Sequence, residues 1–225
     1  MKLKVYVDRL SQPSRAILIF LKANGIEFEE VKIDIVKRQH KSPEFKIMQF
    51  LPILLVHFLE YPSDLFARAK INSVLDWHHS NLRRGAATYV LHTVLAPVLG
   101  LQSNPQAAAE AETLLSSSLS TIESIWLKGN GKFLLGGFRP SIADLSLVCE
   151  IMQLELLEKK DRSRILDPHT KVLQWIENTK NATRPHFYEV HDILYRAKTR
   201  FQEQRLKRAS NKTDSSDRLA LPSKM

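Results

Sequence analysis

The stretch KLKVYVDRLSQPSRAILIFLKANGIEFEEVKIDI (residues 2–35) decides the fold of the N-terminal region. Its first segment, KLKVYV (2–7), alternates in polarity and is rich in β-branched and aromatic residues, which predicts a strand. Pro13 then stands where the first helical turn favours proline, and apolar residues recur at helical spacing up to Gly25, a typical helix end. The segment FEEVKIDI (28–35) alternates again and predicts a second strand. A strand, a helix and a strand with short connections indicate a βαβ unit with parallel pairing.

From residue 63 onward the sequence has the periodicity of long helices. We expect these helices from residue 64 to near Gly85, then on to Gly100, and over 106–128, 141–157, 168–180 and 185–208. Ser141 and Asp144 have the spacing of a capping box in which Asp replaces Glu, so their expected role is to stabilise a helix N-terminus. The helix that they begin is the most apolar of the chain, and we expect it to be central.

These patterns predict an α+β protein in three parts. A small α/β region occupies residues 1–62, and an all-helical region occupies residues 63–208. Residues 209–225 are polar and low in apolar content, which predicts a flexible tail.

Composition and charge exclude or disfavour several classes of function. The 225 residues include one cysteine, Cys149, which excludes an intramolecular disulfide and a CxxC motif and fits a reducing compartment. The longest apolar run, FLPILLVHFL (50–59), is too short for a membrane span, so no membrane association is expected. The net charge is +9, but residues 196–225 hold nine Lys/Arg against three acids. Because the basic charge belongs to this segment and not to a folded face with interleaved aromatics, a nucleic-acid partner is disfavoured.

The loop between the first strand and the helix is a candidate site, because ligands of α/β sheets bind at the carboxyl ends of strands. A serine just before a helix can place its hydroxyl where free N–H groups and the helix dipole stabilise an anion such as a thiolate. The alternative is that Ser11 or Ser14 is simply the N-cap of the helix. The residues alone leave both interpretations open.

Several motifs in the same order resemble the glutathione S-transferase family. They are Ser-Gln-Pro-Ser-Arg-Ala (11–16) after a strand, Lys37-Arg-Gln-His-Lys41, and Pro140-Ser-Ile-Ala-Asp144 within a helical half. The first motif, the Gln-His pair and LDWHHSNLRRG (75–85) are similar to the theta class, and to plant members in particular.

This resemblance implies a thioredoxin-like N-terminal domain that binds glutathione and a helical domain that supplies the pocket for the second substrate. It implies Ser11 as the catalytic residue, whose hydroxyl hydrogen-bonds the glutathione sulfur and stabilises the thiolate, the nucleophilic form. Gln12, His40 and Lys41 match glutathione-binding positions, and a cationic lysine there suits a carboxylate. Without the resemblance, an exposed loop is an equal alternative for His40 and Lys41. The expected reaction is conjugation of glutathione, a co-substrate, to a hydrophobic electrophile, or reduction of an organic hydroperoxide. The resemblance also implies a homodimer.

The segment Met48–Pro62 departs from the family pattern. It has no Val-Pro, no Glu-Ser pair and no hairpin glycine, and no glycine occurs anywhere between Gly25 and Gly85. Leu54–Leu59 resembles the helix that normally follows Glu-Ser, and the neighbours of Pro52 do not fit the family's cis-proline. The thioredoxin-like domain is therefore predicted to be incomplete, with a two-stranded parallel remnant. Glutathione binding is predicted to be greatly weakened or abolished, although Ser11 remains. The alternative function is a non-catalytic dimer partner or a binder of apolar ligands.

Two further expectations come from single residues. His57, His78, His79 and His92 have no partners at metal-ligand spacing, so no metal is expected. The last three residues, Ser223-Lys224-Met225, resemble the Ser-Lys-Leu peroxisomal address. They predict a peroxisomal location, with the cytoplasm as the alternative.

Overall fold

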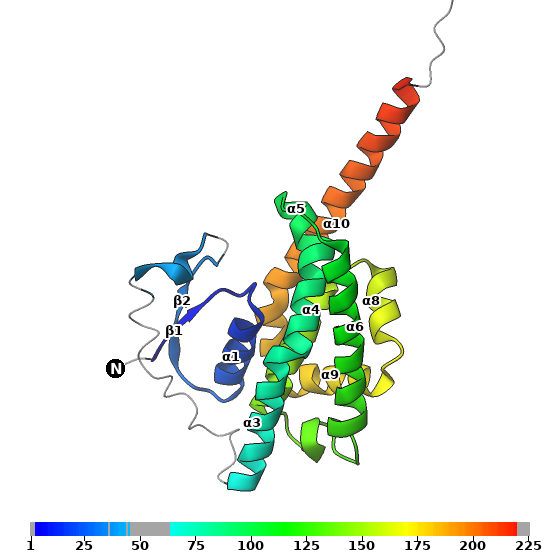
Figure 1. The fold of residues 1–225 in the computed structure, drawn as a ribbon. Coiled ribbons are helices and arrows are strands. Elements are labelled where there is room, and N and C mark those ends of the chain that lie inside the picture. Colours follow the sequence, from blue (N-terminus) through cyan, green and yellow to red (C-terminus); the bar gives the residue numbers. More distant parts are fainter. Residues whose placement is uncertain (1–2, 36, 44, 46–63, 220–225) are drawn as a thin grey trace, which may run out of the picture.

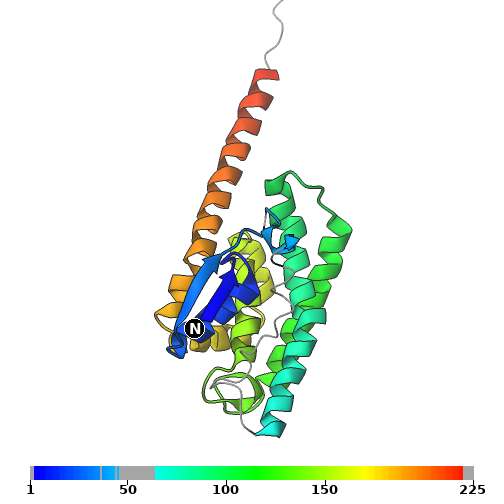
Figure 2. The same ribbon diagram turned by 90° about the vertical axis from the view of Figure 1, so that its left-hand side faces the viewer.

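The computed structural model describes residues 3–35, 37–43, 45 and 64–219, and the side chains of these residues as far as Gln204. In the N-terminal region, β1 (Leu3–Val7) and β2 (Phe28–Lys32) pair in parallel, with Val7 opposite Lys32. The helix α1 (Gln12–Ala23) connects them and lies beside the pair (Figures 1 and 2). The predicted βαβ unit is thus confirmed. No other sheet occurs in the described part of the chain.

The helical half contains two long antiparallel helical segments and a group of helices around one central helix. We call the first of the two long segments the column. The column contains α3 (Leu65–Ser80), α4 (Leu82–Val90), the π-helical η3 (Leu91–Leu95) and α5 (Ala96–Leu99). Its neighbour contains α6 (Pro105–Thr121) and the π-helical η4 (Ile122–Trp126). The remaining elements are η5 (Leu134–Gly136), α7 (Ile142–Ile151), η6 (Met152–Leu156), α8 (Lys159–Leu166), α9 (Thr170–Ala182) and α10 (His186–Leu219). The described part contains no helix that is long and apolar enough to cross a membrane.

The helix α7 is the centre of the molecule, as predicted from its apolar sequence. It packs against α1 of the N-terminal region and against α3, α4 and α9 of the helical half. Leu145, Leu147 and Val148 are fully buried there. One continuous core therefore joins the two halves, which gives the small sheet the cover that two strands alone lack.

Gly85 does not end a helix, contrary to the expectation from the sequence. The helical path bends at Asn81, and α4 then continues through Gly85. A Cβ atom at Gly85 would lie 2.7 Å from the backbone nitrogen of Leu115. Glycine therefore serves the close approach of α4 to α6.

Two other predictions about helices were incomplete. The helix α8 was not predicted, because KKDRSRIL offers only two apolar residues to mark a buried face. The C-terminal helix α10 continues to Leu219, whereas a flexible tail was predicted from residue 209. Residues 186–219 contain neither glycine nor proline, so a helix anchored at its start can propagate through polar sequence. In Figures 1 and 2, the C-terminal part of α10 projects away from the rest of the molecule.

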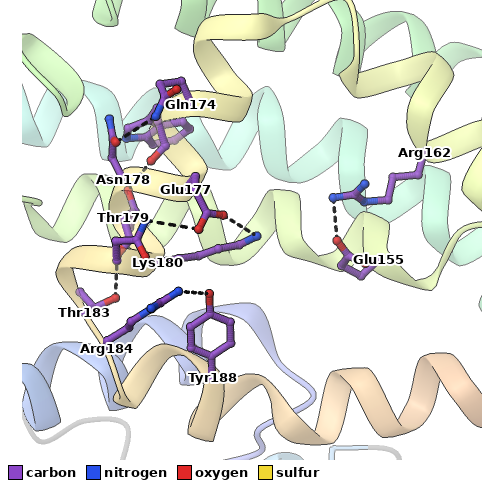
Figure 3. Close-up of polar contacts among 12 residues, drawn as sticks. Glu155, Arg162, Gln174, Glu177, Asn178, Thr179, Lys180, Thr183, Arg184 and Tyr188 are labelled. Atoms are coloured by element: carbon purple, nitrogen blue, oxygen red, sulfur yellow. Dashed lines mark hydrogen bonds and ion pairs between the residues drawn. The ribbon is translucent and has the colours of Figure 1, made fainter.

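The first part of α10 is attached to the body by an ion-pair network around Glu155, a nearly buried residue of η6. One carboxylate oxygen lies 2.7 Å from the Arg162 guanidinium of α8 (Figure 3). The other lies 2.6 Å from Nζ of Lys198 on α10. A buried carboxylate with two cationic partners links three helices at the end of η6.

Candidate active site

The loop between β1 and α1 is organised by Asp8, the first residue after the strand. Its Oδ1 accepts a hydrogen bond from the backbone N–H of Leu10 at 2.9 Å, and its Oδ2 accepts one from Ile35 at 3.0 Å. Its own N–H donates to Oγ of Ser14 at 3.3 Å. One side chain thus joins the loop after β1 to the segment after β2. Both segments lie at the carboxyl edge of the parallel pair, where α/β sheets bind ligands.

Ser11 occupies the N-cap position of α1. Its backbone N–H donates to the carbonyl oxygen of Asp8 at 2.9 Å, and its carbonyl oxygen accepts from the N–H of Arg15 at 3.1 Å. Its side chain is half-buried and makes no capping hydrogen bond. Ser14 does not cap the helix with its side chain either, because its Oγ accepts from Asp8. The Ser11 hydroxyl therefore lies at the positive end of a helix without a capping role, where it can donate to an anion.

The other predicted glutathione-binding residues lie at the start of α1 and after β2. Gln12 is the first residue of α1 and is half-buried. His40 and Lys41 belong to the short 3-10 helix η1 (Gln39–Lys41). Lys41 is exposed, whereas His40 is half-buried and its Nδ1 has no hydrogen-bond partner among the described residues. A cationic lysine at this edge of the sheet suits a carboxylate ligand.

Arg15 supports the Ser11 loop from inside the protein. The residue is fully buried, and its Nη1 donates to the carbonyl oxygens of Arg9 at 3.0 Å and Leu10 at 2.9 Å. Its Nη2 reaches across to the helical half, to the carbonyl oxygen of Cys149 and Oε1 of Gln153, both at 3.1 Å. Burial lowers the pKa of the Arg15 guanidinium, and the nearby Glu150 opposes that shift. The Arg15 side chain thus links the backbone that leads into Ser11 to the helical half.

The sequence interpretation did not identify Asp8, Arg15 or Gln153 as residues that shape the site. Arg15 did carry a signal, because it is a charged residue on the apolar face of α1, next to Ala16. Gln153 carried none, because its partner is 138 positions away in the chain.

The remaining predicted residues lie elsewhere or outside the described part. Ser141 and Asp144 form a reciprocal capping box at the start of α7. The whole Met48–Pro62 segment, with Pro52 and Leu54–Leu59, lies outside the described residues, as does Ser223-Lys224-Met225. Within the described ranges, no group of three His, Cys, Asp or Glu side chains could hold a metal ion.

Cys149 does not offer an alternative nucleophile. Its thiol is fully buried in α7, and burial raises its pKa to about 12. It is therefore a thiol, and not a thiolate, near neutral pH. A sulfur nucleophile at this site has to come from a bound ligand.

Comparison with known proteins gives the same family for both halves. The profile described as "Glutathione S-transferase, N-terminal domain" matches residues 1–54, and "Glutathione S-transferase, C-terminal domain" matches residues 105–178. The chain is 58% identical to glutathione S-transferase T1 of Arabidopsis thaliana, over 91% of this chain and 94% of that protein. It is 57% identical to glutathione S-transferase T2 of the same plant, but it spans only 39% of that longer protein.

The fold is also similar to a solved theta-class structure. A human theta-class glutathione transferase, solved with the glutathione conjugate of 1-menaphthyl sulfate, superposes with a TM-score of 0.77 at 28% identity. The match covers 92% of each chain. A small α/β unit followed by an all-helical half is thus an architecture that this chain shares with a glutathione transferase. The chain belongs to the glutathione S-transferase family. Within that family it belongs to the theta class and is similar to its plant members.

Proposed function

We propose that the protein is a theta-type transferase whose co-substrate is glutathione. In conjugation, the glutathione thiolate forms a carbon–sulfur bond with a hydrophobic electrophile, and the leaving group departs with the bonding electrons. In peroxide reduction, the thiolate attacks the hydroperoxide and releases an alcohol. A second glutathione then converts the sulfenic acid to glutathione disulfide and water.

The observation that supports this proposal most strongly is the Ser11 hydroxyl. It lies at the N-terminus of α1, and its side chain makes no capping hydrogen bond. A hydrogen bond from this hydroxyl to the sulfur favours the charged form and lowers the thiol pKa, because the neutral thiol gains less from the donor. The dipole of α1 acts in the same direction.

We propose that glutathione binding by this chain is weak. The segment Met48–Pro62 has neither the Val-Pro nor the Glu-Ser element with which the family holds two of the three parts of glutathione. Isothermal titration of the purified protein with glutathione measures the affinity directly. An affinity in the usual range of an intact transferase would contradict the weak-binding proposal, and the absence of both binding and turnover would favour the non-catalytic alternative.

Substitution of Ser11 by alanine tests the proposed mechanism. A hydrogen bond to a charged group contributes about 1.5–3 kcal/mol, so S11A should raise the pKa of the bound thiol by about one to two units. The conjugation rate at neutral pH should fall roughly tenfold to a hundredfold. The thiolate absorbance measured against pH reports the first change, and a chromogenic electrophile reports the second. Ser116→Ala, at an exposed position of α6, is the matched control. An unchanged thiol pKa in S11A would remove Ser11 from the mechanism.

We propose that the protein is imported into peroxisomes through Ser223-Lys224-Met225. The tripeptide resembles a receptor-read address. A fluorescent protein fused in front of the full chain is expected to collect in peroxisomes and to stay in the cytosol when the three residues are deleted. Cytosolic signal from both fusions would contradict the proposal.

We also propose a homodimer, which the family resemblance supports. Sedimentation equilibrium of the purified protein gives the mass of the particle. The dimer proposal expects about twice the 25.8 kDa of one chain.

A further inference from the structure

A pair of buried side chains, Arg15 and Gln153, connects the Ser11 loop to the helical half. Arg15 belongs to α1 and is fully buried, and Gln153 belongs to η6 and is 6% exposed. Oε1 of Gln153 accepts from Nη2 of Arg15 at 3.1 Å. A buried guanidinium requires acceptors for its donors, because each unpaired donor costs free energy. Gln153 is the only side chain among the described residues that supplies one by a hydrogen bond; the others are backbone carbonyls.

The same guanidinium holds the peptide group next to Ser11. Its Nη1 donates to the carbonyl oxygen of Leu10 at 2.9 Å, and that carbonyl belongs to the peptide bond whose nitrogen is that of Ser11. That nitrogen donates to the carbonyl oxygen of Asp8 on the other side. The guanidinium is planar and offers its donors in a fixed fork, so rotation of Arg15 would move this peptide group as well.

We infer that Gln153 and Arg15 are positioning residues, through which the helical half sets the direction of the Ser11 hydroxyl. The inference rests on the proposed function in one respect, because it takes Ser11 as the hydrogen-bond donor to the glutathione sulfur. Catalysis of this kind depends on donors held within fractions of an ångström of the developing charge. The chain of contacts leads from η6 through the guanidinium to the Leu10–Ser11 peptide, so a change in the helical half alters the thiol site without touching it.

The test uses Gln153→Met, which keeps the length of the side chain and removes the acceptor. Gln153→Glu keeps an acceptor and is the rescue variant. Gln174→Met, at an exposed position of α9, is the remote control. Far-UV circular dichroism and the thermal midpoint of each variant establish that it is folded. Substitution at Gln153 leaves the three backbone acceptors of Arg15 in place, so it is milder than substitution of Arg15 itself.

Two measurements decide the inference. Amide hydrogen exchange of the segment 8–14 should be roughly fivefold to tenfold faster in Q153M than in the wild type, because the loop loses part of its support. The same exchange should return close to the wild-type rate in Q153E and stay unchanged in Q174M. For variants that bind glutathione, the pKa of the bound thiol should rise in Q153M and be restored in Q153E. If Gln153 served stability alone, Q153M would lower the thermal midpoint and leave the pKa of the bound thiol unchanged.

The outcomes separate the inference from the proposed function. Unchanged exchange of residues 8–14 in Q153M, or equal changes in Q153M and Q153E, would overturn the inference. If the wild type binds no glutathione, the proposed function fails, and the exchange measurement still decides whether Gln153 and Arg15 hold the Ser11 loop. If exchange changes as expected while the pKa of the bound thiol does not, the pair holds the loop without directing the hydroxyl, and the inference is wrong.

Discussion

Substitution of Asp144 by alanine is expected to lower the free energy of unfolding by about 4 kcal/mol. The side chain is fully buried and accepts four hydrogen bonds. Oδ2 accepts from the backbone N–H and from Oγ of Ser141, both at 2.7 Å. Oδ1 accepts from the N–H of Leu134 at 2.9 Å and from Nε1 of Trp175 at 2.7 Å. Removal of the carboxylate leaves several buried donors unpaired at once, which costs more than the loss of an ordinary cap.

The expected cost is large because Asp144 joins three elements. It closes the capping box of α7, fixes the segment that enters η5, and pairs with the buried indole of Trp175 on α9. Burial raises the pKa of Asp144, and the four donors oppose that shift. Burial therefore disfavours the ionised carboxylate of Asp144, whereas its four hydrogen-bond donors stabilise it.

Urea unfolding measured by circular dichroism checks this prediction. S141A removes the hydroxyl and keeps Asp144, so it should cost only about 1 kcal/mol, as is usual for loss of a cap side chain. D144N keeps one acceptor oxygen and should lie between S141A and D144A. If D144A lowered the free energy of unfolding by less than about 1 kcal/mol, the four donors would have found other partners. Asp144 would then not be the residue that joins these three elements.

The capping box illustrates what the sequence can and cannot predict. The Ser141–Asp144 spacing predicts contacts within one helical turn, because those depend only on local geometry. The bond from Trp175 to Asp144 spans 31 positions, and no local pattern indicates it. The βαβ unit could be predicted, like the capping box, from local sequence. Short connections between the two alternating segments and the helix restrict the topology to parallel pairing.

Predictions failed where tertiary contacts or helix propagation override a local signal. Gly85 was interpreted as a helix end, but it serves a close contact with Leu115 that only the packed structure contains. The helix α10 extends past residue 208 because helix formation propagates from an anchored segment. At the site, the positions of Ser11, His40 and Lys41 near the ends of the two strands follow from the motif order. The support of Ser11 by Arg15 and Gln153 depends on packing between the two halves.

The stability of the protein is expected to fall by about 3 kcal/mol between pH 7 and pH 4.5 through His191 alone. This histidine of α10 is fully buried and stacks on Phe187, with ring centroids 4.1 Å apart. Its Nδ1 lies 2.9 Å from the Phe187 carbonyl oxygen, which is the geometry of a neutral ring that donates from Nδ1. Its Nε2 has no partner among the described residues. Burial, and then the positive charge of Arg15, lowers the pKa of His191 to about 3.

The sign of the effect follows from proton binding. The folded protein holds His191 neutral down to about pH 3, whereas the unfolded chain protonates it near its ordinary pKa of about 6.5. The unfolded state therefore binds more protons in this window, and stability decreases as the pH falls below about 6.5. Each pH unit below that value costs about 1.4 kcal/mol, so two units give about 3 kcal/mol. The other charged groups that act on His191 are Arg15 and Lys180, and both also disfavour its protonation.

A comparison of variants isolates this contribution from the other titrating groups. H191F keeps an aromatic ring on Phe187 but has nothing to protonate, so its stability should decrease less steeply between pH 6.5 and 4.5. The difference in slope should be about 1.4 kcal/mol per pH unit. H79F, at an exposed position of α3, is the matched control and should follow the wild type. Urea unfolding at several pH values gives the free energies. Parallel curves for H191F and the wild type would mean that the buried ring accepts a proton without unfolding, which requires a partner for Nε2 or the entry of water.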